Sequence, residues 1–363
     1  MDVRDPQVIY RACTHFLSHH YRKTPQQTLL ELAENLNPQL EADRYGSGSL
    51  INDFEAEIAT LLGKEAAVFM PSGTMCQQIA LRIWSERRGT RNIAFHPLSH
   101  LEIHEHQAYQ RLHNLNAILV GDKNRLLGLD DVKAANTEPL GALLLELPQR
   151  ELGGILPTWD ELVAISSWAR ERQIPLHLDG ARLWECKPFY QRSYAEIAGL
   201  FDSVYVSFYK ILGGLAGSVL TGPADLIAEA RIWQRRHGGN LIQLYPYVLS
   251  AQKGLNDHLE RIETYCIRAR EIAKILSGLP QIDIVPDPPH TNMMHVFIHG
   301  DRDRLLKAFL DVSEETSVWL TGGLMSTPLP TLHKFELTVG EATLDLSCER
   351  IEQLFKMVIE KAA

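Results

Sequence analysis

Short apolar runs alternate along the chain with segments whose apolar residues recur at helical spacing. A short apolar or β-branched run is typical of a strand, and a spacing of three and four residues predicts an amphipathic helix. Strands that alternate with helices favour a mainly parallel sheet. The expected strands are residues 65–70, 93–100 with its turn, 117–120, 140–147, 174–179, the run that begins at 201, and 216–222, which we expect to return antiparallel.

Helices are expected between these strands. Thr158 precedes one of them, at residues 158–173, and Glu161 three residues later completes a capping box. Apolar residues of 251–276 are spaced alternately by four and three, which predicts one long helix that bridges two domains. Strands at 293–298 and 335–339, with helices nearby, predict a smaller domain after it.

The pattern divides the chain into three expected parts. Residues 1–44 are predicted as a helical arm, because apolar residues from Leu29 to Leu36 recur at helical spacing. Residues 45–250 are predicted as a large α/β domain, and residues 251–363 as a small α+β domain. A length of 363 residues agrees with more than one domain.

Composition narrows the class of protein. The chain is 45% hydrophobic and 22% charged, as in a soluble globular protein. A net charge of −9 argues against nucleic acid as a partner. The charged start does not resemble a signal peptide, and no apolar run is long enough to span a membrane. The five cysteines are scattered without paired spacing, so we expect a reduced, cytoplasmic protein.

Two charged residues follow buried-looking strands. Lys210 comes after the run that begins at 201, and Asp179 ends the strand at 174–179. Parallel strands bring such residues to one edge of a sheet, where α/β folds bind ligands. A lysine amine can form a Schiff base with an aldehyde cofactor, and a carboxylate can keep a pyridine nitrogen protonated. This pair therefore favours pyridoxal phosphate; the alternative is a lysine that has simply reached a solvent-exposed loop.

Three further segments carry candidate chemistry. Ser72, Gly73 and Thr74 lie between a strand and a helix, where backbone N–H groups hold anions; the alternative is a helix cap alone. Arg150 follows the strand at 140–147 and is expected at the same sheet edge. Arg235, near the end of a helix, suits either a phosphate contact or the helix dipole.

The histidines from His100 to His106 permit two interpretations. His100 and His104 would share a helical face and could bind a metal, but no third ligand motif lies nearby, so no metal is expected. We favour His100, at a sheet edge, as a residue that stacks on a flat cofactor ring. His104, His106 and His113 are expected to be ordinary helix or surface histidines.

Together these segments resemble the threonine aldolase and aromatic amino acid β-eliminating lyase family, which depends on pyridoxal phosphate and has the type I aminotransferase-like fold. The matching motifs are residues 63–75, Ser99 with His100, 177–183, the segment around Lys210, and 217–220. The resemblance implies a mainly parallel seven-stranded sheet and a homodimer or homotetramer with sites at the dimer interface. It also implies a small amino-acid substrate, with no nucleic acid and no membrane as partners.

The resemblance also implies roles for individual residues. Lys210, His100 and Asp179 would be catalytic, with Lys210 holding the cofactor and Asp179 facing its pyridine nitrogen. Arg182 would lie near both the cofactor hydroxyl and the substrate carboxylate. Arg150, and Tyr45 from a glycine–serine loop, are the other candidates for substrate binding. The remaining expected cofactor contacts are Ser72, Gly73, Thr74, Ser207 and Arg235.

The chain departs from the family pattern around the substrate. Tyr209 precedes the lysine where the family has serine, and Glu336 stands where an arginine is usual. Residues 136–139 lack the family's histidine. The expected activity is aldol cleavage of a β-hydroxy amino acid to glycine and an aldehyde. The alternatives are β-elimination from an amino acid with a leaving group, a regulatory protein without turnover, and a metal hydrolase.

Overall fold

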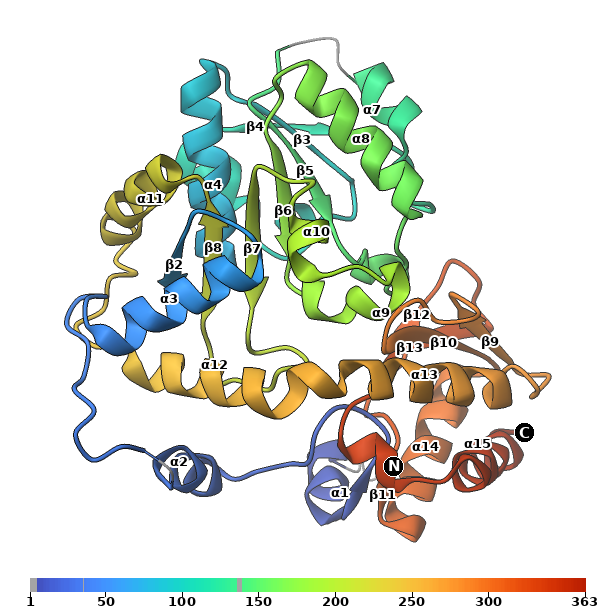
Figure 1. The fold of residues 1–363 in the computed structure, drawn as a ribbon. Helices are drawn as coiled ribbons and strands as arrows, with labels where there is room; N and C mark the ends of the chain where they lie inside the picture. The colour runs from blue at the N-terminus through green and yellow to red at the C-terminus, as the bar shows by residue number, and fades with distance from the viewer. Residues whose placement is uncertain (1–4, 35, 136–138) are drawn as a thin grey trace. The chain divides into compact units, whose positions relative to one another are not determined.

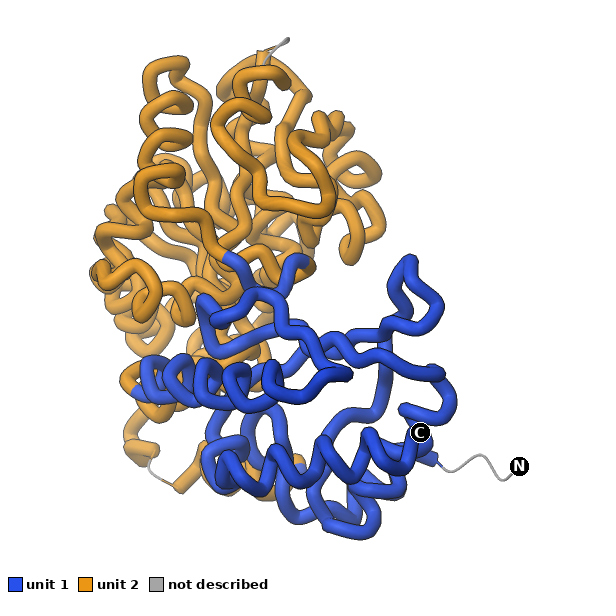
Figure 2. Tube along the Cα trace, turned by 90° about the vertical axis from the view of Figure 1, so that its right-hand side faces the viewer, with its two compact units in different colours: residues 1–24, 152–155, 261–363 blue, residues 25–151, 156–260 orange. Residues whose placement is uncertain are grey.

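The computed structural model describes residues 5–34, 36–135 and 139–363, and it divides into two compact units (Figure 2). Unit 1 comprises residues 1–24, 152–155 and 261–363, and unit 2 comprises residues 25–151 and 156–260. The division into an arm, a large domain and a small domain stays a prediction. The expected features at residues 1–4 and 136–138 lie outside the described residues.

A seven-stranded sheet forms the centre of unit 2 (Figure 1). All its strands run parallel except β8, which is antiparallel to both of its neighbours, so the expected mainly parallel sheet and its returning strand are confirmed. Across the sheet the order is β2 (Ala66–Met70), β8 (Ser218–Gly222), β7 (Ser203–Ser207), β6 (Leu176–Gly180), β5 (Ala142–Glu146), β3 (Asn92–Phe95) and β4 (Asn116–Leu119).

Helices flank this sheet because their apolar faces are buried against it. Ile79 and Ile83 of α4 and Ala230 of α11 pack with Val68 and Leu220 of the sheet. Thr158 and Glu161 form the expected capping box at the start of α8. The helices of unit 2 are α2 (Pro25–Ala33), α3 (Ser49–Leu61), α4 (Gly73–Arg88), α5 (His100–Ile103), α6 (Ala108–His113), α7 (Leu129–Ala135), α8 (Trp159–Glu171), α9 (Lys187–Tyr190), α10 (Tyr194–Ala198), α11 (Ala224–Arg236) and α12 (Tyr245–His258).

One helical expectation needs correction. The long helix expected at 251–276 is interrupted, because α12 ends at His258 and a 3-10 turn at Leu259–Arg261 separates it from α13 (Ile262–Leu276). The apolar spacing continues across the turn, so the pattern does not reveal the break. Part of the expected helical arm is the helix α2, in which none of the residues is buried and Leu29 is 61% exposed.

Unit 1 contains both helices and an antiparallel sheet. Its antiparallel sheet has the order β12 (Met325–Ser326), β13 (Leu332–Thr338), β10 (Met293–His299) and β9 (Ile282–Val285). Phe309, Phe335 and Phe355 contact one another and are almost fully buried, which forms its core. The other elements are α1 (Pro6–Ala12), α13, α14 (Arg302–Thr316), α15 (Cys348–Ala362) and the short parallel pair β1 (His15–Phe16) and β11 (Val318–Trp319).

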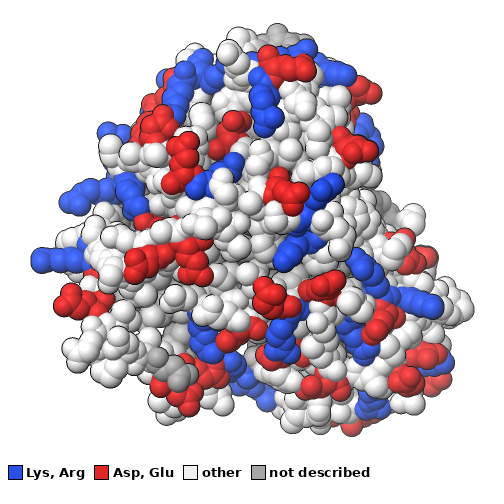
Figure 3. Space-filling view, in the orientation of Figure 1, with Lys and Arg blue, Asp and Glu red and all other residues white. Residues whose placement is uncertain are grey.

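Charged side chains of both signs are interspersed on the face shown in Figure 3, without a large area of one sign. A positively charged surface for phosphate backbones is therefore not evident on that face. Among the described helices, none combines the length and the apolar character that crossing a bilayer would require.

Candidate active site

Three side chains form a row across the carboxyl half of the large sheet. Glu146 of β5 is in register with Asp179 of β6, and Asp179 is in register with Tyr205 of β7. Residues in register on parallel strands project from the same face of a sheet. All three line one cavity of about 160 Å3, together with Lys210.

Asp179 is the most buried carboxylate of this cavity, with 1% of its surface exposed. Its oxygens accept hydrogen bonds from Gln77 Nε2 at 2.7 Å and from the Ala181 backbone N–H at 3.1 Å. Burial nevertheless raises the pKa of Asp179, while the nearby His100 lowers it in part. A cationic group placed beside this carboxylate would stabilise its charged form.

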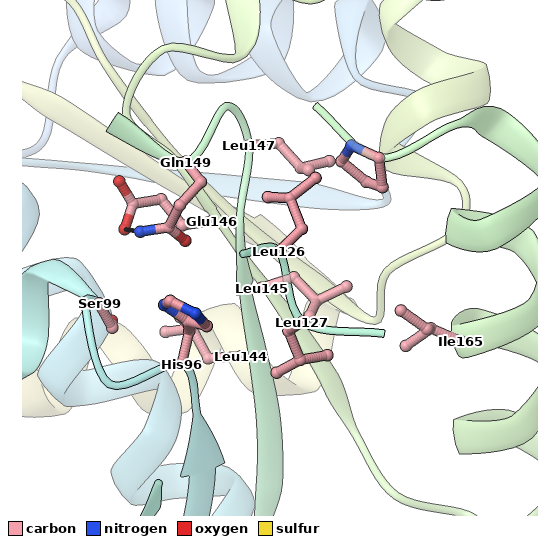
Figure 4. A pocket seen from close by; sticks show the side chains of 11 residues that line it. His96, Ser99, Leu126, Leu127, Leu144, Leu145, Glu146, Leu147, Gln149 and Ile165 are labelled. Carbon is pink, nitrogen blue, oxygen red and sulfur yellow. Dashed lines mark hydrogen bonds between the residues drawn. The ribbon is translucent and has the colours of Figure 1, made fainter. Parts of the chain in front are cut away.

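Glu146 is a second carboxylate in the same cavity. Burial, followed by repulsion from Asp179, raises the pKa of Glu146 to about 8. The backbone N–H of Arg150 donates to its Oε1 at 3.2 Å, and Gln149 Nε2 donates to its Oε2 at 3.3 Å. The hydrogen bond between Gln149 and Glu146 is drawn in Figure 4, which shows a smaller neighbouring cavity of about 30 Å3 that both residues line together with several leucines.

Lys210 follows β7 on a short loop and reaches the cavity. Its Nζ lies 5.2 Å from the centre of the Tyr209 ring. The Tyr209 hydroxyl is 3.2 Å from the hydroxyl of Tyr205. Behind the loop, Ser207 Oγ donates to the Ala181 carbonyl at 2.7 Å, and Trp184 Nε1 donates to the Ser207 carbonyl at 2.8 Å. These hydrogen bonds fix the end of β7 against the segment that follows β6. The loop that carries Lys210 therefore begins from a fixed position.

The N-terminus of α4 closes another side of the site. Ser72 is the N-cap, and its hydroxyl accepts a hydrogen bond from the Met75 N–H at 3.4 Å. Thr74 lines the cavity. Gly73 is in close contact with Tyr205, because a Cβ at this position would lie 1.9 Å from the tyrosine hydroxyl. The close approach leaves the first N–H groups of the helix beside the cavity, which suits an anion.

His100 begins the short helix α5 and lines the cavity. Its Nδ1 lies 2.9 Å from Glu105 Oε1, and Glu105 is held in turn by Gln78 Nε2 at 2.7 Å. This hydrogen bond raises the pKa of His100, since it favours the protonated ring. The carboxylate also fixes the orientation of the imidazole plane.

His104 lines the same cavity, although the sequence suggested an ordinary helix residue. One helical turn separates it from His100, and the two rings are 5.1 Å apart. Its Nε2 lies 3.0 Å from Glu151 Oε1, and the same oxygen accepts a hydrogen bond from Arg150 Nη1 at 2.9 Å. The histidine is therefore part of the site.

The cavity collects six of the expected site residues and omits five. The six that line it are Thr74, His100, Arg150, Asp179, Arg182 and Lys210. Gly73 and Ser207 contact the lining residues Tyr205 and Ala181, and Ser72 caps the helix that carries Thr74. Tyr45 is 47% exposed, with the Arg235 guanidinium 5.9 Å from its ring centre, and neither residue lines the cavity. Gln77, Glu105, Glu146, Tyr205 and His104 were not among the expected site residues.

Some of these omissions left a signal in the sequence. Glu146 ends an apolar strand just as Asp179 does, and Gln77 comes one helical turn after Gly73. His104 stands four residues after His100, so the two share a helical face. Tyr205 lies inside a strand, and only the pairing of β7 with β6 shows that its side chain belongs to the cavity.

The chain is similar to known proteins over most of its length. The model of the beta-eliminating lyase family matches residues 31–300. A structure from Listeria monocytogenes, assigned as an L-allo-threonine aldolase, is 43% identical, with a TM-score of 0.94 over 98% of both chains. A structure from Exiguobacterium, assigned as an aromatic amino acid beta-eliminating lyase/threonine aldolase, is 41% identical, with a TM-score of 0.93 over 98% of this chain and 99% of that one.

Low-specificity L-threonine aldolase 1 of Arabidopsis thaliana is 25% identical over 322 residues, which cover 86% of this chain and 89% of that protein. The solved structures confirm the type I fold expected from the resemblance.

Proposed function

The chain belongs to the beta-eliminating lyase family, and we propose that it cleaves the Cα–Cβ bond of a β-hydroxy amino acid to give glycine and an aldehyde. One observation carries this proposal: a lysine amine and a buried carboxylate share a cavity at the edge of a parallel sheet. Family membership implies pyridoxal phosphate as the cofactor.

The residues of the cavity fit this cofactor. When bound, pyridoxal phosphate supplies an aldehyde that joins an amine and a ring that accepts the electron pair released at Cα. Asp179 would hold the pyridine nitrogen in its protonated form. The positive charge of that nitrogen would lower the pKa of Asp179 and so offset the effect of burial, which raises it. Lys210 would hold the aldehyde, and His100, fixed by Glu105, would lie against the ring.

The phosphate would lie at the N-terminus of α4. Thr74 offers a hydroxyl there, and the close packing of Gly73 on Tyr205 keeps a side chain from covering the N–H groups. Ser72 caps the helix and orients its first turn. Each of these groups is neutral, so much of the electrostatic attraction for the phosphate would come from the partial positive charge at the N-terminus of the helix.

Two arginines of the cavity would hold the carboxylate of the substrate. Arg182 lines the cavity with only 11% of its side chain exposed, and Arg150 also lines it, where it contacts Glu151. A planar guanidinium binds a carboxylate through two parallel hydrogen bonds. Arg150 would then compensate for Glu336, which stands where the family has an arginine.

A covalent labelling experiment tests the cofactor part of this proposal. Protein treated with pyridoxal phosphate and then borohydride should carry a stable adduct on Lys210, identified by peptide mapping. Lys210→Ala should lose the adduct, and Lys123→Ala, at an exposed loop position, should retain it. An adduct on another lysine would refute the assignment of Lys210.

Product analysis separates the two candidate reactions. Glycine and an aldehyde from allo-threonine or β-phenylserine support aldol cleavage. Pyruvate and ammonia from an amino acid with a β leaving group would instead indicate β-elimination, which the description of the family keeps as the alternative.

We also propose that the enzyme is a cytoplasmic homo-oligomer. The five cysteines are free thiols, as expected in a reducing compartment. Tyr45 is half exposed and does not line the cavity of its own chain, which leaves it free to contribute to the site of a second subunit. Sedimentation of the holoenzyme should give a dimer or tetramer, and a monomer would contradict this arrangement.

A further inference from the structure

We propose that His104 is the base that removes the proton from the β-hydroxyl group of the substrate, and that Glu151 positions it. The inference rests on the proposed aldol cleavage and assigns the step that no other residue described above performs. It begins from the contacts of one imidazole. His104 Nε2 lies 3.0 Å from Glu151 Oε1, so the carboxylate fixes one ring nitrogen as the donor.

The second ring nitrogen, Nδ1, remains available. Within the described part of the chain, the hydrogen bond found for this ring involves Nε2. When Glu151 holds the proton on Nε2, the tautomer of the neutral ring leaves a lone pair on Nδ1. The His104 side chain is 41% exposed and lines the cavity, so a ligand bound there can reach this ring.

The neighbours of His104 indicate which part of the substrate it meets. Glu151 Oε1 also accepts from Arg150 Nη1 at 2.9 Å, so one carboxylate oxygen holds the base and an arginine proposed for the substrate carboxylate. A β-hydroxy amino acid carries its carboxylate on Cα and its hydroxyl on the adjacent Cβ. Groups that bind these two functions must themselves be close together, as Arg150 and His104 are.

His100 is a less suitable base, although it also lines the cavity. Its Nδ1 is engaged by Glu105, and that contact raises the pKa of His100, which favours the protonated ring over the neutral ring that can accept a proton. The ring of His104 lies 5.1 Å from that of His100. A base at His104 would therefore lie next to a cofactor ring held against His100.

The proposed step balances in atoms and electrons. The hydroxyl proton passes to Nδ1 of His104, and the oxygen forms a C=O bond with Cβ. The Cα–Cβ bond breaks, the aldehyde leaves, and the electron pair of the broken bond stays with the glycine half. Cα of the glycine half then takes up a proton from solvent, which completes glycine, and His104 returns the hydroxyl proton to solvent. The protons balance, and no oxidant or further reactant is required.

Two reactions of the holoenzyme test the role of His104. Cleavage of β-phenylserine, followed by the absorbance of benzaldehyde, requires a base at the β-hydroxyl. Exchange of the Cα proton of glycine in D2O, followed by NMR, uses the same cofactor site but involves no β-hydroxyl. His104→Asn should lower the cleavage rate at least about 100-fold, as expected for loss of a general base, with glycine exchange within about twofold.

Two matched variants complete the experiment. Glu151→Gln should lower the ratio of cleavage to exchange about tenfold, since the imidazole keeps its place but loses the carboxylate. His106→Asn changes an exposed histidine outside the cavity and should leave both rates unchanged.

The outcomes distinguish this inference from the proposed function. Normal cleavage in His104→Asn, or an equal fall in cleavage and exchange, would overturn the role of His104 while the function stands. A wild-type enzyme that exchanges glycine but cleaves no β-hydroxy amino acid would overturn the proposed function, and with it the role of His104.

Discussion

Gly73→Ala is expected to destabilise unit 2, because the backbone at this position lies directly against a buried ring. A Cβ at Gly73 would lie 1.9 Å from Tyr205 Oη and 2.1 Å from its Cζ. Tyr205 is 3% exposed, and its hydroxyl meets that of Tyr209 at 3.2 Å, so the ring cannot move into solvent. Forcing an extra group into such a packed core costs about 1–3 kcal/mol.

Denaturant unfolding measures this cost. Gly73→Ala should lower the unfolding midpoint with an unchanged slope, and it should lower the melting temperature by about 2–4 °C for each kcal/mol. Gly323→Ala is the matched control, because a Cβ there meets no atom within 4 Å. The control should unfold at the midpoint of the wild-type protein.

A double-mutant cycle identifies the cause. Tyr205→Leu removes the ring, so adding Gly73→Ala to it should cost less than it costs alone, with a coupling energy of about 0.5–3 kcal/mol. Two results would refute this reasoning. Either Gly73→Ala unfolds like the wild-type protein, or it lowers the free energy of unfolding as much in the Tyr205→Leu background as alone. In both cases the contact with Tyr205 would not explain why residue 73 is a glycine.

Three further changes test the site. Asp179→Asn should preserve the fold and lower turnover by orders of magnitude, whereas near-normal turnover would remove Asp179 from the pyridine nitrogen. Arg150→Ala should raise the apparent dissociation constant of amino acids about tenfold to a hundredfold, as loss of a charged hydrogen bond of about 1.5–3 kcal/mol predicts; unchanged binding beside a loss in Arg182→Ala would exclude it. Glu146→Gln should flatten the pH dependence of stability of the cofactor-free protein. A pKa of Glu146 raised from 4.5 to about 8 means that the folded protein loses stability as pH rises between these values, and an unchanged pH profile would contradict it.

The strand-end residues could be predicted because their position depends on local rules. An apolar run that ends in Asp179 or leads to Lys210 places each residue at the carboxyl edge of the sheet, whatever the order of the strands. The structure brings both residues into one cavity.

Other parts of the site depend on features that a periodic pattern does not contain. Tyr205 enters the cavity through the register of β7 against β6, which is set by contacts far apart in the sequence. The break at Leu259–Arg261 leaves the apolar spacing on both sides unchanged, so it could not be predicted either.

The row of Glu146, Asp179 and Tyr205 determines which changes of chain length the enzyme can tolerate during evolution. Side chains of a strand alternate between faces, so insertion or deletion of one residue within β6 before Asp179 would turn Asp179 to the opposite face. Leu178 or Gly180 would then take its place in the row. Surface loops can lengthen at little cost, as loop-closure entropy grows slowly with length. Substrate range in this lineage should therefore diverge through its loops, while the strand lengths that carry the row stay constant.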